Sequence, residues 1–147
     1  MLEIQSDIEE VIIRTYSQSM QGHSAYSFLI RQDQGQEILE SKIMMHHAHE
    51  GKAELIAIVA ALRTLAAPSL ILLFPYHTSY LSQEFSNLEN GIKHIYKPNE
   101  VDIFDELTEL LHYHDVLIEY SKNSVPETEL LKEATVAILK EKCFLDE

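Results

Sequence analysis

The densest group of potential metal ligands in the sequence is a histidine cluster, His46, His47 and His49, followed by Glu50. Imidazole nitrogens bind zinc, nickel and copper, and a loop could fold three such ligands around one ion. Adjacent side chains such as His46 and His47 often diverge, however, and a solvated loop is the commoner structure for such a segment. The cluster is therefore a candidate transition-metal site, with a hydrated loop as the alternative.

A second segment with chemical potential is Tyr76-His77-Thr78-Ser79, where a histidine lies close to a serine. The serine nucleophile of a hydrolase usually sits on a sharp turn flanked by glycines, and this segment contains none. We therefore interpret the segment as packing at the end of a strand. The single cysteine, Cys143, excludes a disulfide framework and a cysteine-based zinc site, and we interpret it as structural or incidental.

The charge of the chain limits its partners. Lys and Arg number 11 and Asp and Glu number 24 in 147 residues, which gives a formal net charge of −13. Binding to nucleic acid or to an anionic membrane needs a basic face, and the cations here are scattered singly. No apolar run approaches the roughly 20 residues of a membrane span. We expect a soluble cytoplasmic protein with a protein partner or self-association, without nucleic acid.

The candidate residues must be positioned by an alternation of strands and helices. We predict strands at 11–17, 24–31, 37–45, 69–74 and 115–121, helices at 53–67, 78–85, 101–112 and 127–142, and loops at 46–52 and 87–99. Three strands in an antiparallel meander, followed by alternating helices and strands, predict an α/β fold. The mixed five-stranded sheet would combine the meander with parallel strands and carry helices on both faces. We expect one domain over 1–147, with its core at about 11–142.

Three segments in this order resemble ribonuclease H type 1 and its superfamily. The segment 53–62 has an acidic residue followed by a Leu- and Ala-rich run, like the first helix of that family. Segments 101–107 and 118–122 resemble the helix before the last strand, and that strand itself. The resemblance implies a ribonuclease H-like fold. It also implies the chemistry of the family, in which four carboxylates hold two Mg²⁺ ions that hydrolyse the RNA strand of an RNA–DNA hybrid.

Only one of those four carboxylates has a counterpart in this chain. The first-strand Asp of the family falls on Tyr16, and the helix Glu falls on Glu54, which matches. The fourth-strand Asp falls on Tyr76 when counted from the strand, or on His77 when counted from the following helix. The Asp of the last helix falls on Lys132, which reverses the charge. We therefore expect no catalytic residues and no metal cofactor.

Two of these losses do not depend on the alignment, because neither 11–32 nor 55–83 contains an Asp or Glu. In the last helix, Glu129 or Glu133 could replace Lys132 in another register. Two carboxylates would still be a poor cage for two Mg²⁺ ions. We predict that Glu54 forms an ion pair with Lys132 or a hydrogen bond with Tyr16. The alternative is a remnant ligand or catalytic base.

The resulting hypothesis is a catalytically silent ribonuclease H-like domain that works as a protein-interaction or scaffold module. The alternative is a nuclease with residual Mg²⁺-dependent activity or with altered chemistry at a His/Glu transition-metal site. That site would consist of Glu54 with His77, or of the cluster His46, His47 and His49.

Overall fold

A single sheet organises the computed structural model, which describes residues 9–32, 37–44, 50–89, 101–120 and 125–145. Its strand order is β3-β2-β1-β4-β5. The strands are β1 (Glu9–Met20), β2 (His23–Gln32), β3 (Glu37–Ile43), β4 (Ser69–Phe74) and β5 (Asp115–Ile118). The first three pair antiparallel, whereas β4 is parallel to β1 and β5 is parallel to β4. This arrangement confirms the predicted mixed sheet.

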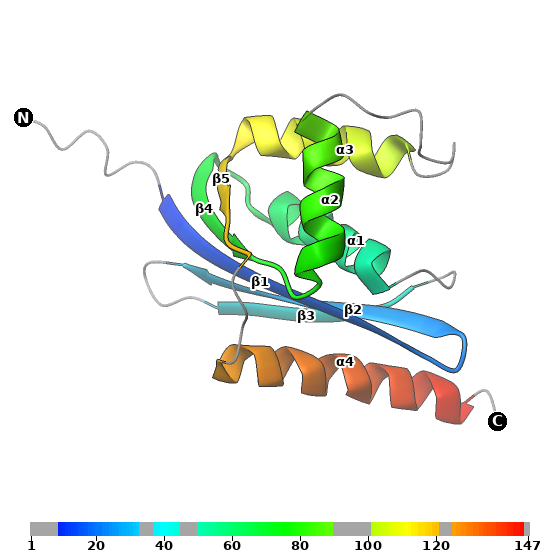
Figure 1. The fold of residues 1–147 in the computed structure, drawn as a ribbon. Helices are drawn as coiled ribbons and strands as arrows, with labels where there is room; N and C mark the ends of the chain where they lie inside the picture. Colours follow the sequence, from blue (N-terminus) through cyan, green and yellow to red (C-terminus); the bar gives the residue numbers. More distant parts are fainter. Residues whose placement is uncertain (1–8, 33–36, 45–49, 90–100, 121–124, 146–147) are drawn as a thin grey trace, which may run out of the picture.

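Helices cover both faces of the sheet, as predicted. They are α1 (Glu50–Thr64), α2 (Thr78–Glu89), α3 (Val101–Tyr113) and α4 (Pro126–Leu145). Figure 1 shows α4 on one side of the sheet and the other three helices on the opposite side. Within the described ranges, no helix is both long enough and apolar enough to cross a bilayer.

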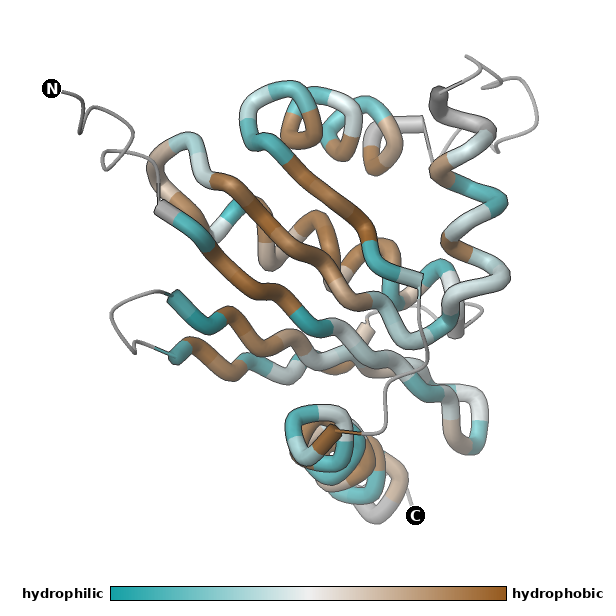
Figure 2. Tube along the Cα trace, turned by 60° about the vertical axis from the view of Figure 1, so that its left-hand side comes forward, coloured by the Kyte–Doolittle hydropathy of each residue, from teal (hydrophilic) through white to brown (hydrophobic). Residues whose placement is uncertain are grey.

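The core lies between α1 and the sheet. Leu55, Ile58 and Leu62 of α1 are fully buried, because the helix contacts β1 and β2 on one side and α3 on the other. Hydrophobic residues run along β1, β4 and β5 in Figure 2, as expected for strands that are covered by helices. This burial explains why α1 is apolar almost all round.

Several predicted boundaries were wrong. β1 continues to Met20 and β2 already begins at His23. The reason is that a tight turn with positive φ at Gln21 (50°) and Gly22 (79°) joins the two strands directly. The strand predicted at 37–45 ends at Ile43, and the one predicted at 115–121 ends at Ile118.

The helix boundaries also differ from the predictions. Residues 50–52 and 87–89, predicted as loops, belong to α1 and α2, while α1 stops at Thr64 rather than at 67. α3 runs to Tyr113, and α4 starts at Pro126 and continues to Leu145. The histidine cluster His46, His47 and His49 lies outside the described residues.

Gly51 explains why α1 begins earlier than the composition suggests. It is buried in the first turn of α1, where the Tyr80 side chain of α2 lies directly against its Cα. A Cβ at this position would overlap the Cβ, Cγ and Cδ1 atoms of Tyr80. These atoms belong to the base of a packed aromatic side chain, which cannot swing aside. Glycine is therefore required here for close packing of α1 against α2.

We expect Gly51→Ala to lower the free energy of unfolding by about 1–3 kcal/mol, because the overlap with Tyr80 forces the two helices apart. The overlap outweighs the gain of about 1 kcal/mol in helix propensity that alanine brings. Chemical denaturation followed by circular dichroism measures the change. In a Tyr80→Ala background the same substitution should cost nothing or stabilise the protein. An equal loss in both backgrounds would contradict this explanation.

Candidate functional site

The candidate site lies where β4 ends. β4 pairs with β1 only as far as Phe74, which lies opposite Arg14. Beyond this point the edge of β1 meets the turn that leads from β4 into α2. Glu54 reaches the same point from α1. Three segments that are far apart in the sequence therefore converge on one carboxylate.

The Glu54 carboxylate is fully buried and accepts hydrogen bonds on both oxygens. Oε2 accepts from the Thr15 hydroxyl at 2.6 Å and from the Tyr76 backbone N–H at 2.5 Å. Oε1 accepts from the His77 backbone N–H and lies next to His77 Nδ1, each at 2.7 Å. His77 Nδ1 also lies 3.4 Å from the Ser17 hydroxyl. The carboxylate thus joins α1, β1 and the start of α2.

These four contacts use the hydrogen-bonding capacity of the carboxylate. A carboxylate has about four lone-pair positions, and Glu54 directs two contacts to each oxygen. Two of the donors are the amides of Tyr76 and His77, which directly precede α2, and a negative charge at this helix end is favoured by the helix dipole. The first turn of α2 contains no acidic residue of its own. Glu54 therefore supplies the charge that this helix end favours.

An aromatic cluster covers the carboxylate on its outer side. The Tyr16 and Tyr76 rings meet edge to face with centroids 4.7 Å apart, and the Tyr76 and His77 rings do so at 5.2 Å. Lys132 Nζ from α4 lies 5.4 Å from the centroid of the Tyr76 ring. The structure thus brings together all of the residues that the sequence assigned to this site: Tyr16, Glu54, Tyr76, His77 and Lys132.

The predicted partners of Glu54 were wrong. The ammonium of Lys132 pairs with Glu129 at 3.7 Å, one turn earlier in α4, and the Tyr16 hydroxyl donates to Gln18 at 2.7 Å. Consecutive strand residues point to opposite faces of a sheet. Thr15 faces α1 and reaches Glu54, whereas Tyr16 faces α4 and packs against Leu131.

Sequence reasoning brought His77 close to Glu54 but missed the hydroxyl and the backbone amides that hold this carboxylate. Thr15 carries one signal that could have identified it, since it continues the buried face of β1 formed by Val11 and Ile13 but is polar. A buried hydroxyl requires a partner, and an acidic residue on the covering helix is an obvious one. The backbone amides of Tyr76 and His77 leave no such signal, because every residue other than proline has one.

The donor set does not fit the two Mg²⁺ ions of the ribonuclease H family. Among the described residues, no three His, Cys, Asp or Glu side chains are grouped so that they could hold a metal ion. Among the residues that the structure describes, Glu54 is the one carboxylate that these hydrogen bonds place at the junction, and its oxygens already accept protein hydrogen bonds. Glu54 and His77 do come together, as the sequence suggested for a transition-metal pair, but no third ligand of these types joins them.

This sheet order, with α1 and α4 on opposite faces, defines a ribonuclease H-like fold. The chain is similar to the N-terminal ribonuclease H domain of a Mycobacterium tuberculosis protein, with a TM-score of 0.68, 12% identity, and coverage of 95% of this chain and 99% of that one. Ribonuclease H1 from Halobacterium salinarum gives a TM-score of 0.65 and 18% identity over 90% of this chain and 98% of that one. The LC11 ribonuclease H1, solved in complex with an RNA/DNA hybrid, gives a TM-score of 0.60 and 15% identity over 88% of this chain and 99% of that one.

These similarities are similarities of fold. No protein-family profile and no curated protein matches the sequence. The shared architecture therefore places the chain among ribonuclease H-like structures, and its chemistry has to be argued from its own residues.

Proposed function

We propose that this chain is a catalytically silent ribonuclease H-like domain that works as a protein-interaction module. The observation that carries the first part is the saturation of Glu54 by four protein contacts. A metal ion could bind this carboxylate only if the Thr15 hydroxyl or the backbone amides of Tyr76 and His77 lost their acceptor. Tyr16 and Lys132 supply no anionic ligand to compensate for that loss.

The surface charge supports the same proposal. Four cations in the described part of the chain are engaged by partners of their own, which leaves them less able to neutralise phosphates. Arg31 pairs with Glu37 and Glu127, Arg63 pairs with Glu106, Arg14 lies 4.3 Å from the centroid of the Phe74 ring, and Lys132 pairs with Glu129. The chain has a formal net charge of −13 and would repel the phosphates of an RNA–DNA hybrid, so a protein is the better partner. We place this module in the cytoplasm, on the argument of its single cysteine.

A cleavage assay tests the proposal. The purified chain is incubated with a labelled RNA–DNA hybrid in Mg²⁺ or Mn²⁺, with the ribonuclease H1 from Halobacterium salinarum as the positive control. We expect no cleavage above background and no metal by elemental analysis. Hybrid cleavage that Glu54→Gln abolishes in a folded variant would instead support a nuclease with residual activity. Stoichiometric bound transition metal would support altered chemistry at Glu54 with His77 or at His46, His47 and His49.

A further inference from the structure

A groove of about 570 Å³ follows the outer edge of β5. It is lined by β5 and the residues after it, by α3 and by one residue of α2: Val116, Leu117, Ile118, Tyr120, Thr108, Leu111, His112 and Phe85. Val116 and Leu117 point to opposite faces of the sheet, because side chains alternate along a strand. A groove that touches both must therefore run along the edge of the strand itself.

The backbone of β5 presents hydrogen-bonding groups to this groove. The Glu119 N–H donates to the Leu73 carbonyl of β4 at 2.8 Å, so the residues that share its direction, 115 and 117, also face β4. By the two-residue period of a strand, the backbone groups of Val116 and Ile118 point away from β4. In the described part of the chain, β5 is the last strand on this side of the sheet. The groove thus offers a template for one more strand.

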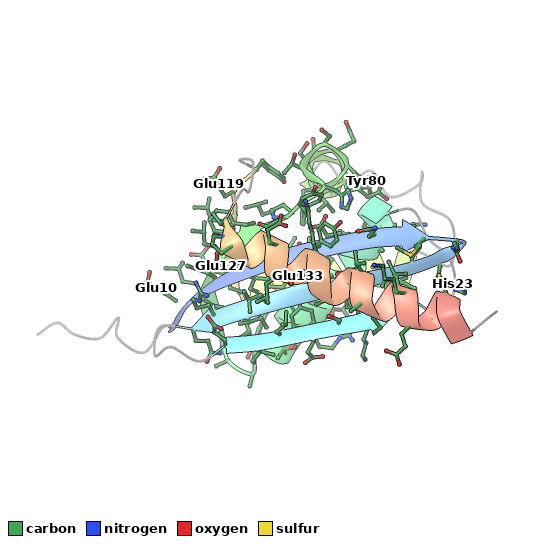
Figure 3. All side chains as sticks on the ribbon, turned by 90° about the horizontal axis from the view of Figure 1, so that it is seen from below. Glu10, His23, Tyr80, Glu119, Glu127 and Glu133 are labelled. Atoms are coloured by element: carbon green, nitrogen blue, oxygen red, sulfur yellow. The ribbon has the colours of Figure 1, made fainter. Side chains whose placement is uncertain are left out.

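The exposed side chains along this edge are apolar in the middle, at Leu117, and acidic on either side, at Asp115 and Glu119. Leu117 is 68% exposed, and Tyr120 is 37% exposed, which is unusual for large apolar side chains beside an open strand edge. Asp115 at the start of β5 and Glu119 just after its end flank Leu117, and both are exposed. Figure 3 shows Glu119 at the same end of the molecule as Glu10 and as Glu127, which is paired with Arg31.

We propose that this groove binds an extended segment of another protein, which pairs with β5 and carries Lys or Arg opposite Asp115 and Glu119. Main-chain hydrogen bonds would give affinity. Alternate apolar side chains would enter the groove beside Val116 and Ile118, and the side chains between them would lie beside Leu117 on the other face. This inference rests on the proposed role as an interaction module, and it names the surface and the chemistry of the partner.

The charge pattern disfavours a second copy of this chain as the occupant. If two β5 strands paired antiparallel about Leu117, Asp115 of each copy would lie opposite Glu119 of the other. Like charges directly opposite each other destabilise a strand pair. The formal net charge of −13 adds repulsion between whole copies. Both arguments favour a basic partner instead.

Selection from a displayed library of random ten-residue peptides on the purified full chain tests the groove. We expect the enriched peptides to carry net positive charge and to alternate apolar residues with others. Their affinity, measured by fluorescence anisotropy, should fall at least ten-fold on Leu117→Asp and on the double variant Asp115→Lys/Glu119→Lys. A proline at the centre of the peptide should abolish binding, because it cannot donate to the strand.

Leu39→Asp is the matched control, because Leu39 is 42% exposed on β3, the strand at the opposite edge of the sheet, and should not affect binding. Leu117→Asp should fold, since its side chain already faces solvent, and circular dichroism checks this. The proposal would be overturned if no peptides were enriched, or if neither Leu117→Asp nor Asp115→Lys/Glu119→Lys changed the affinity of the enriched peptides. Dimers that Leu117→Asp dissolves would identify a second copy as the occupant and also overturn it. None of these results affects the cleavage assay, which tests catalytic silence separately.

Discussion

Replacing Glu54 by alanine should lower the free energy of unfolding by about 3–5 kcal/mol, the range expected when a buried, paired charge is lost. The substitution leaves the buried Thr15 hydroxyl and the amides of Tyr76 and His77 without their acceptor. It also opens a cavity at a position with no solvent exposure. Urea denaturation followed by circular dichroism measures the loss.

Two further variants make this result specific. Glu54→Gln keeps the shape of the side chain but places a donor where an acceptor is needed, so we expect an intermediate loss of about 2 kcal/mol. Glu133→Ala removes an exposed acid from α4 and should change stability by less than about 0.5 kcal/mol. A carboxylate kept for metal binding usually costs stability, so a neutral or stabilising Glu54→Ala would contradict a structural role.

His114 should make the protein lose stability as the pH falls from 7 to 5. Its Nδ1 accepts the Ser69 N–H at 3.1 Å, which ties the start of β5 to the start of β4 and leaves the ring proton on Nε2. The side chain is 3% exposed, and Nε2 is buried without a hydrogen bond of good geometry in the described part of the chain. Burial therefore lowers the pKa of His114 below 6.5, and the nearby Leu62 carbonyl opposes this shift only in part.

The direction of the pH effect follows from that lowered pKa. Below pH 6.5 the unfolded chain takes up the proton first, so the contribution of His114 is complete above this pH and declines below it. The decline is at most about 1.4 kcal/mol per pH unit for one proton. His114→Asn keeps an acceptor for the Ser69 N–H but does not titrate.

Measuring the unfolding free energies of both proteins between pH 7 and 5 tests the assignment to His114. The difference between wild type and His114→Asn should shrink as the pH falls. A difference that stays constant would exclude His114 as the source of the pH dependence. Glu127 does not affect the comparison. The hydrogen bond from Arg31 lowers the pKa of Glu127 below its ordinary value of 4.5, so the stability that Glu127 contributes is lost only at a pH more acidic than the range measured.

Most of the architecture could be predicted from the sequence because its signals are local. The apolar run at 69–74 became β4 without a change of boundary, and α1 is buried as its composition indicates. The errors fall where a distant segment decides the structure. Gly51 appeared to mark a loop, but it allows close packing against Tyr80, twenty-nine positions further along the chain. The polar end of β1 is a strand because β2 pairs with it.

The site was predicted less completely than the fold. The resemblance to ribonuclease H gathered Tyr16, Glu54, Tyr76, His77 and Lys132, and the structure places them together. It brought His77 to Glu54 but identified neither the Thr15 hydroxyl nor the backbone amides that Glu54 accepts. Side-chain charge suggested Lys132, yet a fully buried carboxylate is satisfied at lower cost by a hydroxyl and by amides whose positions the fold already fixes, since an ammonium must also be stripped of water.

The turn between β4 and α2 is held from the inside of the molecule. Turns at the ends of strands usually direct their amides to water, which lets them shift when a ligand arrives. Here the amides of Tyr76 and His77 bind a carboxylate that belongs to the most deeply buried helix. This corner therefore moves with α1 as one rigid body, and any closing motion of the protein around a partner must hinge elsewhere.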